Sequence, residues 1–308
     1  MFSHQETEYK PTPILKWAGG KSRLLPQIRK RYPSEKDREK INTYIEPFIG
    51  GGAVFFDIIS FFNLQNIYLF DTNIELIILY KTIQKDVNQL IQELLDISDD
   101  YLRLDENERI NFYYQKREEY NQFNKTENIH NSNDNFVRRS ALTLFLNRTC
   151  FNGLFRVNKK GKFNVPHGRY KNPKILNIEN LQAAAAALQI ATLQQVDFSE
   201  VLKYADSHTF IYYDPPYRPI SKTSNFNAYG SVEFDDNEQH RLQQVFTTVS
   251  QQGGFQMLSN SDPTNYVNDD FFDELYKDFK IERILASRMI NSKGNSRGEI
   301  RELLITNY

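Results

Sequence analysis

Short hydrophobic runs alternate with segments of helical periodicity along most of the chain. The runs that predict strands are Ile41–Ile45, Asn66–Phe70, Ala191–Val196, His208–Tyr213, Phe255–Ser259, Ile281–Ala286 and Glu302–Thr306. The segments that predict helices are Ala53–Phe62, Ile74–Asp96, Phe136–Asn147, Leu181–Leu188 and Gln239–Gln251. Strands that alternate with helices are typical of α/β folds. The pattern therefore predicts an α/β protein built around a sheet.

The predicted strands lie toward both ends of the chain, and the long segment between them is mainly helical in pattern. Within it, Asp99–His130 is charged, is helical in pattern at first and then becomes polar. Asn121–Asn135 is rich in Asn, so we expect this stretch to be a loop and assign it no role. We therefore predict one sheet domain formed by residues 1–74 and 176–308, interrupted by a second domain at residues 75–175.

A glycine loop follows the first predicted strand. Gly50, Gly51 and Gly52 lie between that strand and the next helix, where glycine lets the backbone approach a ligand closely. Asp71 ends the following strand about 20 residues later, where an acid commonly binds ribose hydroxyls. A structural turn and a helix N-cap remain the alternatives. Because the GxGxxG pattern is absent, a nicotinamide-dependent oxidoreductase is disfavoured.

A second candidate binding segment is Lys16-Trp17-Ala18-Gly19-Gly20-Lys21, which contains the only tryptophan of the chain. The face of a tryptophan can accept a cation or a base. The alternative is a turn around a core tryptophan. The segment lacks the GxxxxGK[ST] spacing of a phosphate-binding loop.

The tetrapeptide Asp214-Pro215-Pro216-Tyr217 directly follows a predicted strand, and ligands of α/β proteins bind at such strand ends. Asp214 and the Pro215 carbonyl can each accept one N–H of an exocyclic amine, and Tyr217 can stack on the ring that carries it. Such an amine is a poor nucleophile because its lone pair is delocalised, so methyl transfer from a sulfonium needs positioning and charge complementarity. The segment thus predicts amine methylation, with a proline-stiffened turn as the alternative.

Charge is unevenly distributed, although the net charge is only −1. Between Asn135 and Ile178 there is no Asp or Glu, and the basic residues of this block are Arg138, Arg139, Arg148, Arg156, Lys159, Lys160, Lys162, Arg169, Lys171 and Lys174. Aromatic residues and glycines are interleaved with them. This favours a nucleic-acid-binding loop over a solvated basic surface.

Cys150 is the only cysteine, which excludes an internal disulfide and a cysteine-cluster zinc site, and we predict no metal site. The polar N-terminus shows no signal peptide, and no apolar run approaches membrane-spanning length. We therefore expect a cytoplasmic protein without a membrane partner.

Eight motifs, in order, resemble the Dam-type DNA adenine-N6 methyltransferases, the α or D12 class. They are LKWAGGK at 15–21, YIEPFIGGG at 44–52, FDTN at 70–73, FLNRTCFNGLFRVN at 145–158, GKFNVPHGRYKNP at 161–173, VDF at 196–198, DPPY at 214–217 and LSNSD at 258–262. The resemblance covers nearly the whole chain. It implies a Rossmann-like S-adenosylmethionine-dependent methyltransferase sheet with an inserted, mainly helical DNA-recognition domain that carries a β-hairpin.

The resemblance also implies roles for individual residues. The catalytic set is Asp214, Pro215, Pro216 and Tyr217. The set expected to bind S-adenosyl-L-methionine is Trp17, Lys21, Glu46, Phe48, Gly50, Gly52, Asp71, Asp197, Phe198 and Asp214, with Asp71 on the ribose and Asp197 and Phe198 on the adenine. The set expected to contact double-stranded DNA is Lys16, Arg148, Phe151, Asn152, Leu154, Arg156 and Pro166. Phe151 stands where some members have tyrosine, and it is expected to wedge into the duplex beside a flipped adenine.

The resemblance favours adenine in GATC as the target. A cytosine-N4 methyltransferase and a catalytically silent DNA-binding protein remain alternatives. Cytosine-C5 methylation is disfavoured, because it needs a nucleophilic cysteine and Cys150 does not stand beside a proline. We expect a monomer, and a cognate restriction endonuclease is the protein partner that such a system can include.

Overall fold

The computed structural model describes residues 9–123, 134–158, 160–218, 234–265, 269–286 and 300–308. Its strands are β1 Thr43–Glu46, β2 Asn66–Phe70, β3 Ala191–Gln194, β4 Thr209–Tyr213, β5 Phe255–Ser261, β6 Lys280–Ala286 and β7 Ile300–Thr306. Its α-helices are α1 Leu25–Arg29, α2 Glu35–Arg38, α3 Ala53–Ile58, α4 Ile74–Arg103, α5 Glu106–Gln122, α6 Asp134–Thr149, α7 Ile178–Leu188, α8 Asp236–Gln251 and α9 Phe271–Leu275. Short 3₁₀ helices are η1 Phe151–Gly153, η2 Phe198–Lys203 and η3 Pro263–Asn265.

The seven strands form one sheet in the order β3-β2-β1-β4-β5-β7-β6. β1 is parallel to β2 and to β4, β4 is parallel to β5, and β7 is antiparallel to β5 and β6. Every residue of β4 is buried, as expected for a central strand of a sheet covered on both faces. The mostly parallel sheet confirms the predicted Rossmann-like α/β fold.

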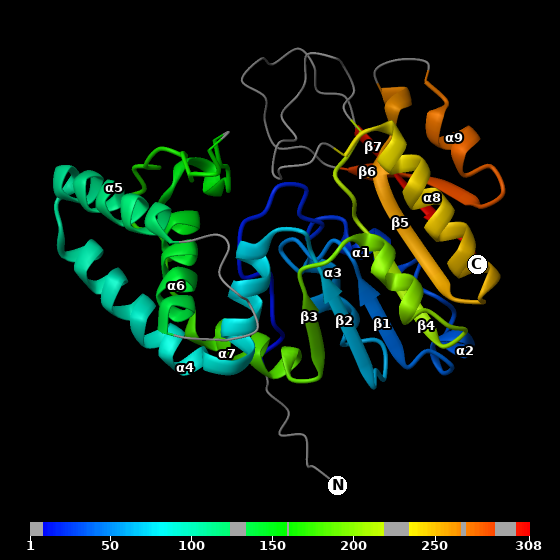
Figure 1. Ribbon diagram of the computed structural model, residues 1–308, viewed down its shortest axis with the longest axis horizontal. Helices are drawn as coiled ribbons and strands as arrows, with labels where there is room; N and C mark the ends of the chain where they lie inside the picture. Colours follow the sequence, from blue (N-terminus) through cyan, green and yellow to red (C-terminus); the bar gives the residue numbers. More distant parts are fainter. Residues whose placement is uncertain (1–8, 124–133, 159, 219–233, 266–268, 287–299) are drawn as a thin grey trace, which may run out of the picture. The chain divides into compact units, whose positions relative to one another are not determined.

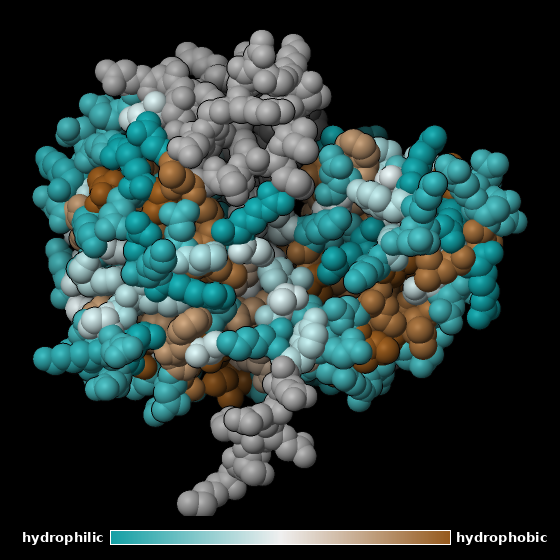
Figure 2. Space-filling view, turned by 180° about the vertical axis from the view of Figure 1, so that it is seen from behind, coloured by the Kyte–Doolittle hydropathy of each residue, from teal (hydrophilic) through white to brown (hydrophobic). Residues whose placement is uncertain are grey.

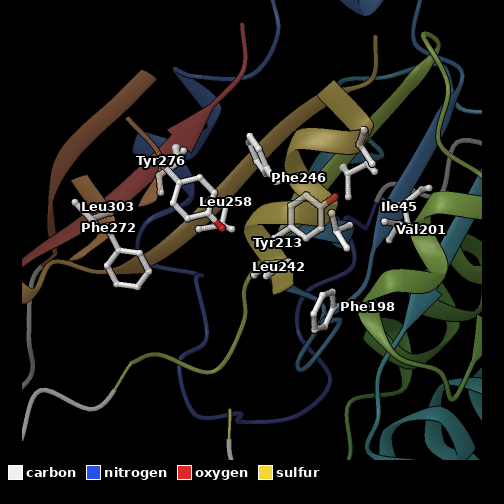
Figure 3. Packing of buried hydrophobic residues seen from close by; sticks show 14 of the residues in the cluster. Ile45, Phe198, Val201, Tyr213, Leu242, Phe246, Leu258, Phe272, Tyr276 and Leu303 are labelled. Atoms are coloured by element: carbon white, nitrogen blue, oxygen red, sulfur yellow. The ribbon is translucent and has the colours of Figure 1, made fainter. Parts of the chain in front are cut away.

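Helix α8 covers part of this sheet (Figure 1). It begins after Asp235, whose side chain accepts a hydrogen bond from the Glu238 backbone. Its buried residues follow helical spacing, and Phe246 packs against Tyr213 of β4 with ring centroids 5.9 Å apart. Figure 3 shows the apolar side chains of α8 and the sheet gathered in one cluster with Phe272 and Tyr276. Burying each such side chain stabilises the fold by about 1.5–3 kcal/mol.

The long helix α4 packs against α6 and α7, and α5 packs against α6 (Figure 1). The side chain of Asn73 caps the start of α4, and a capping box at Asp105 starts α5. Two predicted boundaries were wrong. α4 continues beyond Asp96 to Arg103, because its buried residues extend to Tyr101. α3 ends at Ile58 and not at Phe62.

The described chain forms two compact units. The first unit comprises the described residues of Met1–Gly20, Gly50–Asp57 and Asn73–Gln195. The second unit comprises those of Lys21–Ile49, Ile58–Thr72 and Val196–Tyr308. The first unit thus includes segments of the N-terminus and the glycine loop beside the helices, and a separate domain at residues 75–175 remains a prediction. Most of the predicted Asn-rich loop, residues 124–133, lies outside the described residues.

Most of the surface in Figure 2 is hydrophilic, and smaller apolar areas lie between the polar side chains. Within the described ranges, no helix has the length and apolar character needed to cross a membrane. Among the large hydrophobic side chains that remain exposed, Phe151 has 51% of its surface accessible.

Candidate functional site

Three acidic residues lie at the carboxyl ends of three adjacent parallel strands in the second unit. Glu46 ends β1, Asp71 follows β2, and Asp214 follows β4. In the sheet, β2 lies on one side of β1 and β4 lies on the other side, so the strand order reverses direction at β1. In open α/β sheets, ligands bind outside the carboxyl ends of the strands at such a reversal. The fold therefore brings together acids that are far apart in the sequence.

Asp214 is held by two donors. The ammonium of Lys21 lies 2.7 Å from its Oδ1 and 2.8 Å from its Oδ2. The hydroxyl of Ser259, on β5, donates to Oδ1 at 3.2 Å. Burial raises the pKa of the Asp214 carboxyl above its ordinary value, whereas Lys21 and Ser259 act in the opposite direction. The carboxylate is thus oriented by fixed partners at the strand end.

Tyr217 lies beside this ion pair. The Lys21 ammonium is 4.6 Å from the centroid of the Tyr217 ring, a distance typical of a cation–π contact. The Tyr217 hydroxyl donates to Glu302 of β7 at 2.5 Å. Burial, reinforced by the neighbouring carboxylates of Asp214 and Glu302, raises the pKa of Tyr217 well above its ordinary value, so the hydroxyl stays a donor. The structure therefore brings the predicted residues Lys21, Asp214 and Tyr217 into direct contact.

Glu46 is 2% exposed and accepts a hydrogen bond from the Tyr44 hydroxyl at 2.7 Å. Burial is the main cause that raises the pKa of Tyr44, and the negative charge of Glu46 adds to it. A nearly buried carboxylate is costly unless hydrogen bonds satisfy it. Tyr44 thus holds Glu46 at the end of β1.

Phe48 and Phe198 also meet in the second unit, with ring centroids 5.6 Å apart, and Phe234 packs against both. Phe198 is only 2% exposed, and the guanidinium of Arg241 lies 4.0 Å from its ring centroid. Phe48 is half-buried, so it is the more accessible of the two predicted rings.

Asp197 forms a two-pronged ion pair with Arg241, at 2.6 and 2.8 Å. Its side chain also accepts a hydrogen bond from the backbone of Ser199 at the start of η2. The Arg241 hydrogen bonds are the largest cause that lowers the pKa of Asp197 far below its ordinary value. The Asp197 side chain remains 44% exposed.

The glycine loop and Trp17 meet in the first unit. Gly50 has a φ of +47°, and a Cβ at this position would lie 3.0 Å from the Trp17 ring. Gly52 is closely approached by the Tyr80 hydroxyl, which also donates to the Gly50 carbonyl. The ring of Trp17 also packs against that of Phe155, with ring centroids 5.3 Å apart. Two motifs separated by about 30 residues are therefore one structural element.

Lys16 is tied to the loop that follows α6. Asn147 accepts a hydrogen bond from the Lys16 backbone at 2.9 Å and donates to the Lys16 and Gly153 carbonyls at 2.9 and 3.0 Å. Gly153 has a φ of +65°, and a Cβ there would lie 2.4 Å from the Lys16 side chain. The Lys16 ammonium lies 5.6 Å from the centroid of the Tyr170 ring. This arrangement brings Lys16 next to the other residues predicted to contact DNA.

The predicted hairpin is held by two isolated antiparallel bridges, Cys150 with His167 and Val157 with Phe163, rather than by continuous strands. The backbone N–H of the exposed Phe151 donates to the carbonyl of Pro166, which is exposed as well. The segment therefore presents an aromatic side chain and a proline next to each other at its surface.

Arg156 is exposed on the same segment, and its Nε donates to Asn164 at 2.9 Å. Asn152 is exposed with a φ of +58°, and its backbone donates to the Tyr170 hydroxyl at 3.0 Å. Leu154 is half-buried. The hairpin thus holds a guanidinium in a defined orientation with solvent beside it.

Part of the basic block has a different role from the one its charge indicated. Arg139 is 1% exposed and forms a two-pronged ion pair with Glu75 at 2.7 and 2.9 Å. Arg138 pairs with Glu119 and Glu93. The half-buried Arg148 donates to the Ile14 carbonyl. The interpretation of the basic block as a nucleic-acid-binding loop was wrong for Arg139, because helix packing buries it with its counterion Glu75.

Sequence reasoning missed the residues that hold the site in place. They are Tyr44, Asn147, Asn164, Tyr170, Arg241, Ser259 and Glu302. Tyr44, Asn147, Asn164, Tyr170 and Ser259 lie in the quoted motifs, so those motifs indicated importance without a role. Arg241 and Glu302 carry no local pattern that links them to their partners. Within the described part of the chain, no three His, Cys, Asp or Glu residues cluster as metal ligands.

Comparison with known proteins supplies the family. Residues 17–290 match the model of the D12 class N6 adenine-specific DNA methyltransferase family. The chain is 45% identical to the Type II methyltransferase M.MjaIII of Methanocaldococcus jannaschii, over 96% of this chain and 99% of that protein. It is 37% identical to the Type II methyltransferase M1.LlaDCHI of Lactococcus lactis, over 99% of this chain and 98% of that protein.

It is also 33% identical to the DNA adenine methylase of Escherichia coli, over 94% of this chain and 93% of that protein. The family description names adenine N6 and not cytosine N4, which decides between the two amine-methylating alternatives. The chain therefore belongs to the D12 class of N6 adenine-specific DNA methyltransferases.

Proposed function

We propose that the chain transfers a methyl group from S-adenosyl-L-methionine to N6 of an adenine flipped out of double-stranded DNA, within GATC. The observation that carries the proposal is the Asp214 carboxylate at the end of the buried strand β4, held by Lys21 and Ser259 beside the Tyr217 ring. The choice of GATC rests on the resemblance of the hairpin motifs alone.

Asp214 acts as an acceptor in this proposal. A carboxylate has about four lone-pair sites, so Lys21, Ser259 and an incoming amine can share Asp214. Together with the Pro215 carbonyl, Asp214 accepts the two N–H groups of adenine N6. These bonds localise the nitrogen lone pair toward the methyl donor. Tyr217 supports the base by stacking, which fixes the angle of attack.

S-adenosylmethionine supplies, when bound, a methyl group on a positively charged sulfur. Glu46 and Asp71, at the ends of β1 and β2, are acids of the kind that suit ribose hydroxyls and an ammonium group. The half-buried ring of Phe48 suits a flat heterocycle. Because Gly50 and Gly52 have no Cβ, the Trp17 ring and the Tyr80 hydroxyl pack directly against the backbone of the glycine loop. The acids and the ring of the second unit therefore fit the methyl donor.

The hairpin is the proposed DNA-reading element, within a recognition domain at residues 75–175. The 51% exposed ring of Phe151 can insert into a duplex and offset the few kcal/mol that base flipping costs. Arg156 can bond a guanine through two nitrogens, while Lys16 contacts a neighbouring base. Asn152, Leu154 and Pro166 complete the proposed surface.

We also infer that the enzyme acts as a monomer and serves with a restriction endonuclease. The support for the second point is the Type II naming of the relatives from Methanocaldococcus jannaschii and Lactococcus lactis.

The test is methylation of plasmid DNA by the wild-type protein and by Asp214→Ala, followed by digestion with GATC-cutting endonucleases of different methyl sensitivity. We expect wild-type protein to protect GATC sites, and Asp214→Ala to lose activity while it still retards the DNA in a gel. Methyl incorporation into adenine without GATC protection would refute only the target site. Wild-type turnover by Asp214→Ala would refute the role of the carboxylate.

A further inference from the structure

Glu302 connects the C-terminal strand to the DPPY segment. It lies on β7, opposite Ser261 of β5 and Ile284 of β6. Its carboxylate accepts a hydrogen bond from the Tyr217 hydroxyl at 2.5 Å, although the two residues are 85 positions apart in the sequence. The last strand of the chain, which lies between β5 and β6 in the sheet, thus contributes a charged group to the surroundings of the Tyr217 ring.

The Tyr217 ring is constrained at two places. Its hydroxyl end is bonded to Glu302, and its face lies 4.6 Å from the Lys21 ammonium, which also binds Asp214. Hydrogen bonds to an ionised acceptor are about twice as strong as neutral ones. A carboxylate at the hydroxyl also increases the electron density of the ring, and an electron-rich ring face attracts positive charge.

We propose that Glu302 is a positioning residue for methyl transfer: it holds Tyr217 in the orientation that supports the target base and makes the ring face more negative where positive charge develops on the amine. Glu302 acts through Tyr217 and does not touch the substrate. The inference rests on the proposed function, in which Tyr217 stacks on the flipped adenine.

A double-mutant cycle tests whether Glu302 acts through the tyrosine hydroxyl. The proteins are wild type, Glu302→Ala, Tyr217→Phe and the double variant. The measurements are steady-state methylation, which gives kcat and the KM values for S-adenosylmethionine and DNA, and single-turnover methylation, which gives the rate constant of methyl transfer. We expect each single variant to lose about ten-fold in kcat, as when one charge-assisted hydrogen bond is removed, with an unchanged KM for S-adenosylmethionine. We expect the double variant to be no slower than the slower single variant.

Conservative and surface controls separate positioning from folding. Glu302→Gln keeps an acceptor without the charge, so its kcat should lie between those of Glu302→Ala and wild type. Glu282→Gln removes an acid from the neighbouring strand β6 that pairs with Arg31 and Lys280, and it should leave kcat unchanged. Thermal melts of all variants identify any that fail to fold, and Glu302→Gln then serves in the cycle in place of Glu302→Ala.

Two results would overturn the inference. One is a double variant whose loss is the product of the two single losses, because independent effects multiply. The other is a Glu302→Ala protein with the wild-type kcat. In both cases an active wild-type enzyme leaves the proposed function intact, whereas a wild-type protein that methylates no adenine refutes the proposed function itself.

Discussion

At the scale of single residues, the proposed role of Asp214 depends on the balance between its burial and the charge beside it. Removal from water favours the neutral acid, and a nearby cation favours the carboxylate. Lys21, which is 3% exposed, supplies that cation at 2.7 Å. Because only an ionised carboxylate offers all its lone pairs to the amine, Lys21 favours the form of Asp214 that the proposed mechanism needs, against the effect of burial.

Lys21→Met tests this balance. Without the ammonium, the pKa of Asp214, which burial already raises, should rise further. Since activity needs the carboxylate, the acid limb of the kcat–pH profile should move to higher pH, and kcat at neutral pH should fall. The measurement is kcat between weakly acidic and alkaline pH. Ser259→Ala removes the weaker donor and should shift the limb less in the same direction. Superimposable profiles of Lys21→Met and wild type would contradict the proposed balance.

At the scale of elements, hydrogen bonds from helices α4, α5 and α6 hold the hairpin segment in place. Asn147 of α6 bonds both the Lys16 and Gly153 backbones, and Tyr113 of α5 donates to the Val165 carbonyl at 2.8 Å. The His167 ring accepts or donates a hydrogen bond with Tyr101 of α4 at 2.7 Å. A segment with few bridges of its own thus gains a fixed shape from these helices, as the proposed role in reading sequence requires.

Arg156→Ala tests the hairpin as a reader of sequence. Loss of a two-pronged bond to guanine should reduce discrimination between the cognate and a near-cognate site by about 1–3 kcal/mol. The measurement is the ratio of kcat/KM values for duplexes that differ at one base pair. Arg103→Ala, which removes a 75% exposed arginine of the first unit, is the control and should leave the ratio unchanged. An unchanged ratio in Arg156→Ala as well would show that Arg156 does not read bases.

At the scale of the whole molecule, ion pairs join elements that are distant in sequence, and they make stability depend on pH. Arg241 of α8 pairs with Asp197, which caps η2, and α8 packs on η2. The arginine depresses the pKa of Asp197 below its ordinary value of 3.8. The stabilisation is therefore present above about pH 3.8 and is lost as the pH falls toward the lower folded pKa.

Arg241→Ala should accordingly lower Tm more at pH 7 than at pH 3, as measured by thermal unfolding without ligand. Both side chains are more than a third exposed, so we expect a small difference, about 1 kcal/mol or less. Lys203→Ala, which breaks an exposed pair with Glu200 in η2, should have a weaker effect. An Arg241→Ala deficit that grows toward low pH would be inconsistent with this linkage.

The sequence by itself determined the element types and most of the chemistry. β2 begins and ends as predicted at Asn66 and Phe70. A short run of β-branched and aromatic residues between polar residues favours a strand through its local sequence alone. Asp71 and Asp214 were found because strand ends are visible as the point where a hydrophobic run stops. The helix boundaries at Ile58 and Arg103 were missed, because packing and not propensity sets where those helices end.

Only the tertiary structure decided which groups meet. The partners of Asp214, namely Lys21 and Ser259, are 193 and 45 residues away along the chain, and Glu302 reaches Tyr217 from the last strand. Tertiary packing also decided that Arg139 is a buried ion-pair partner whereas Arg156 faces solvent, although both belong to one basic block. The reason is physical: a residue's own chemistry is local, whereas its burial and its counterion depend on side chains that only the fold brings near.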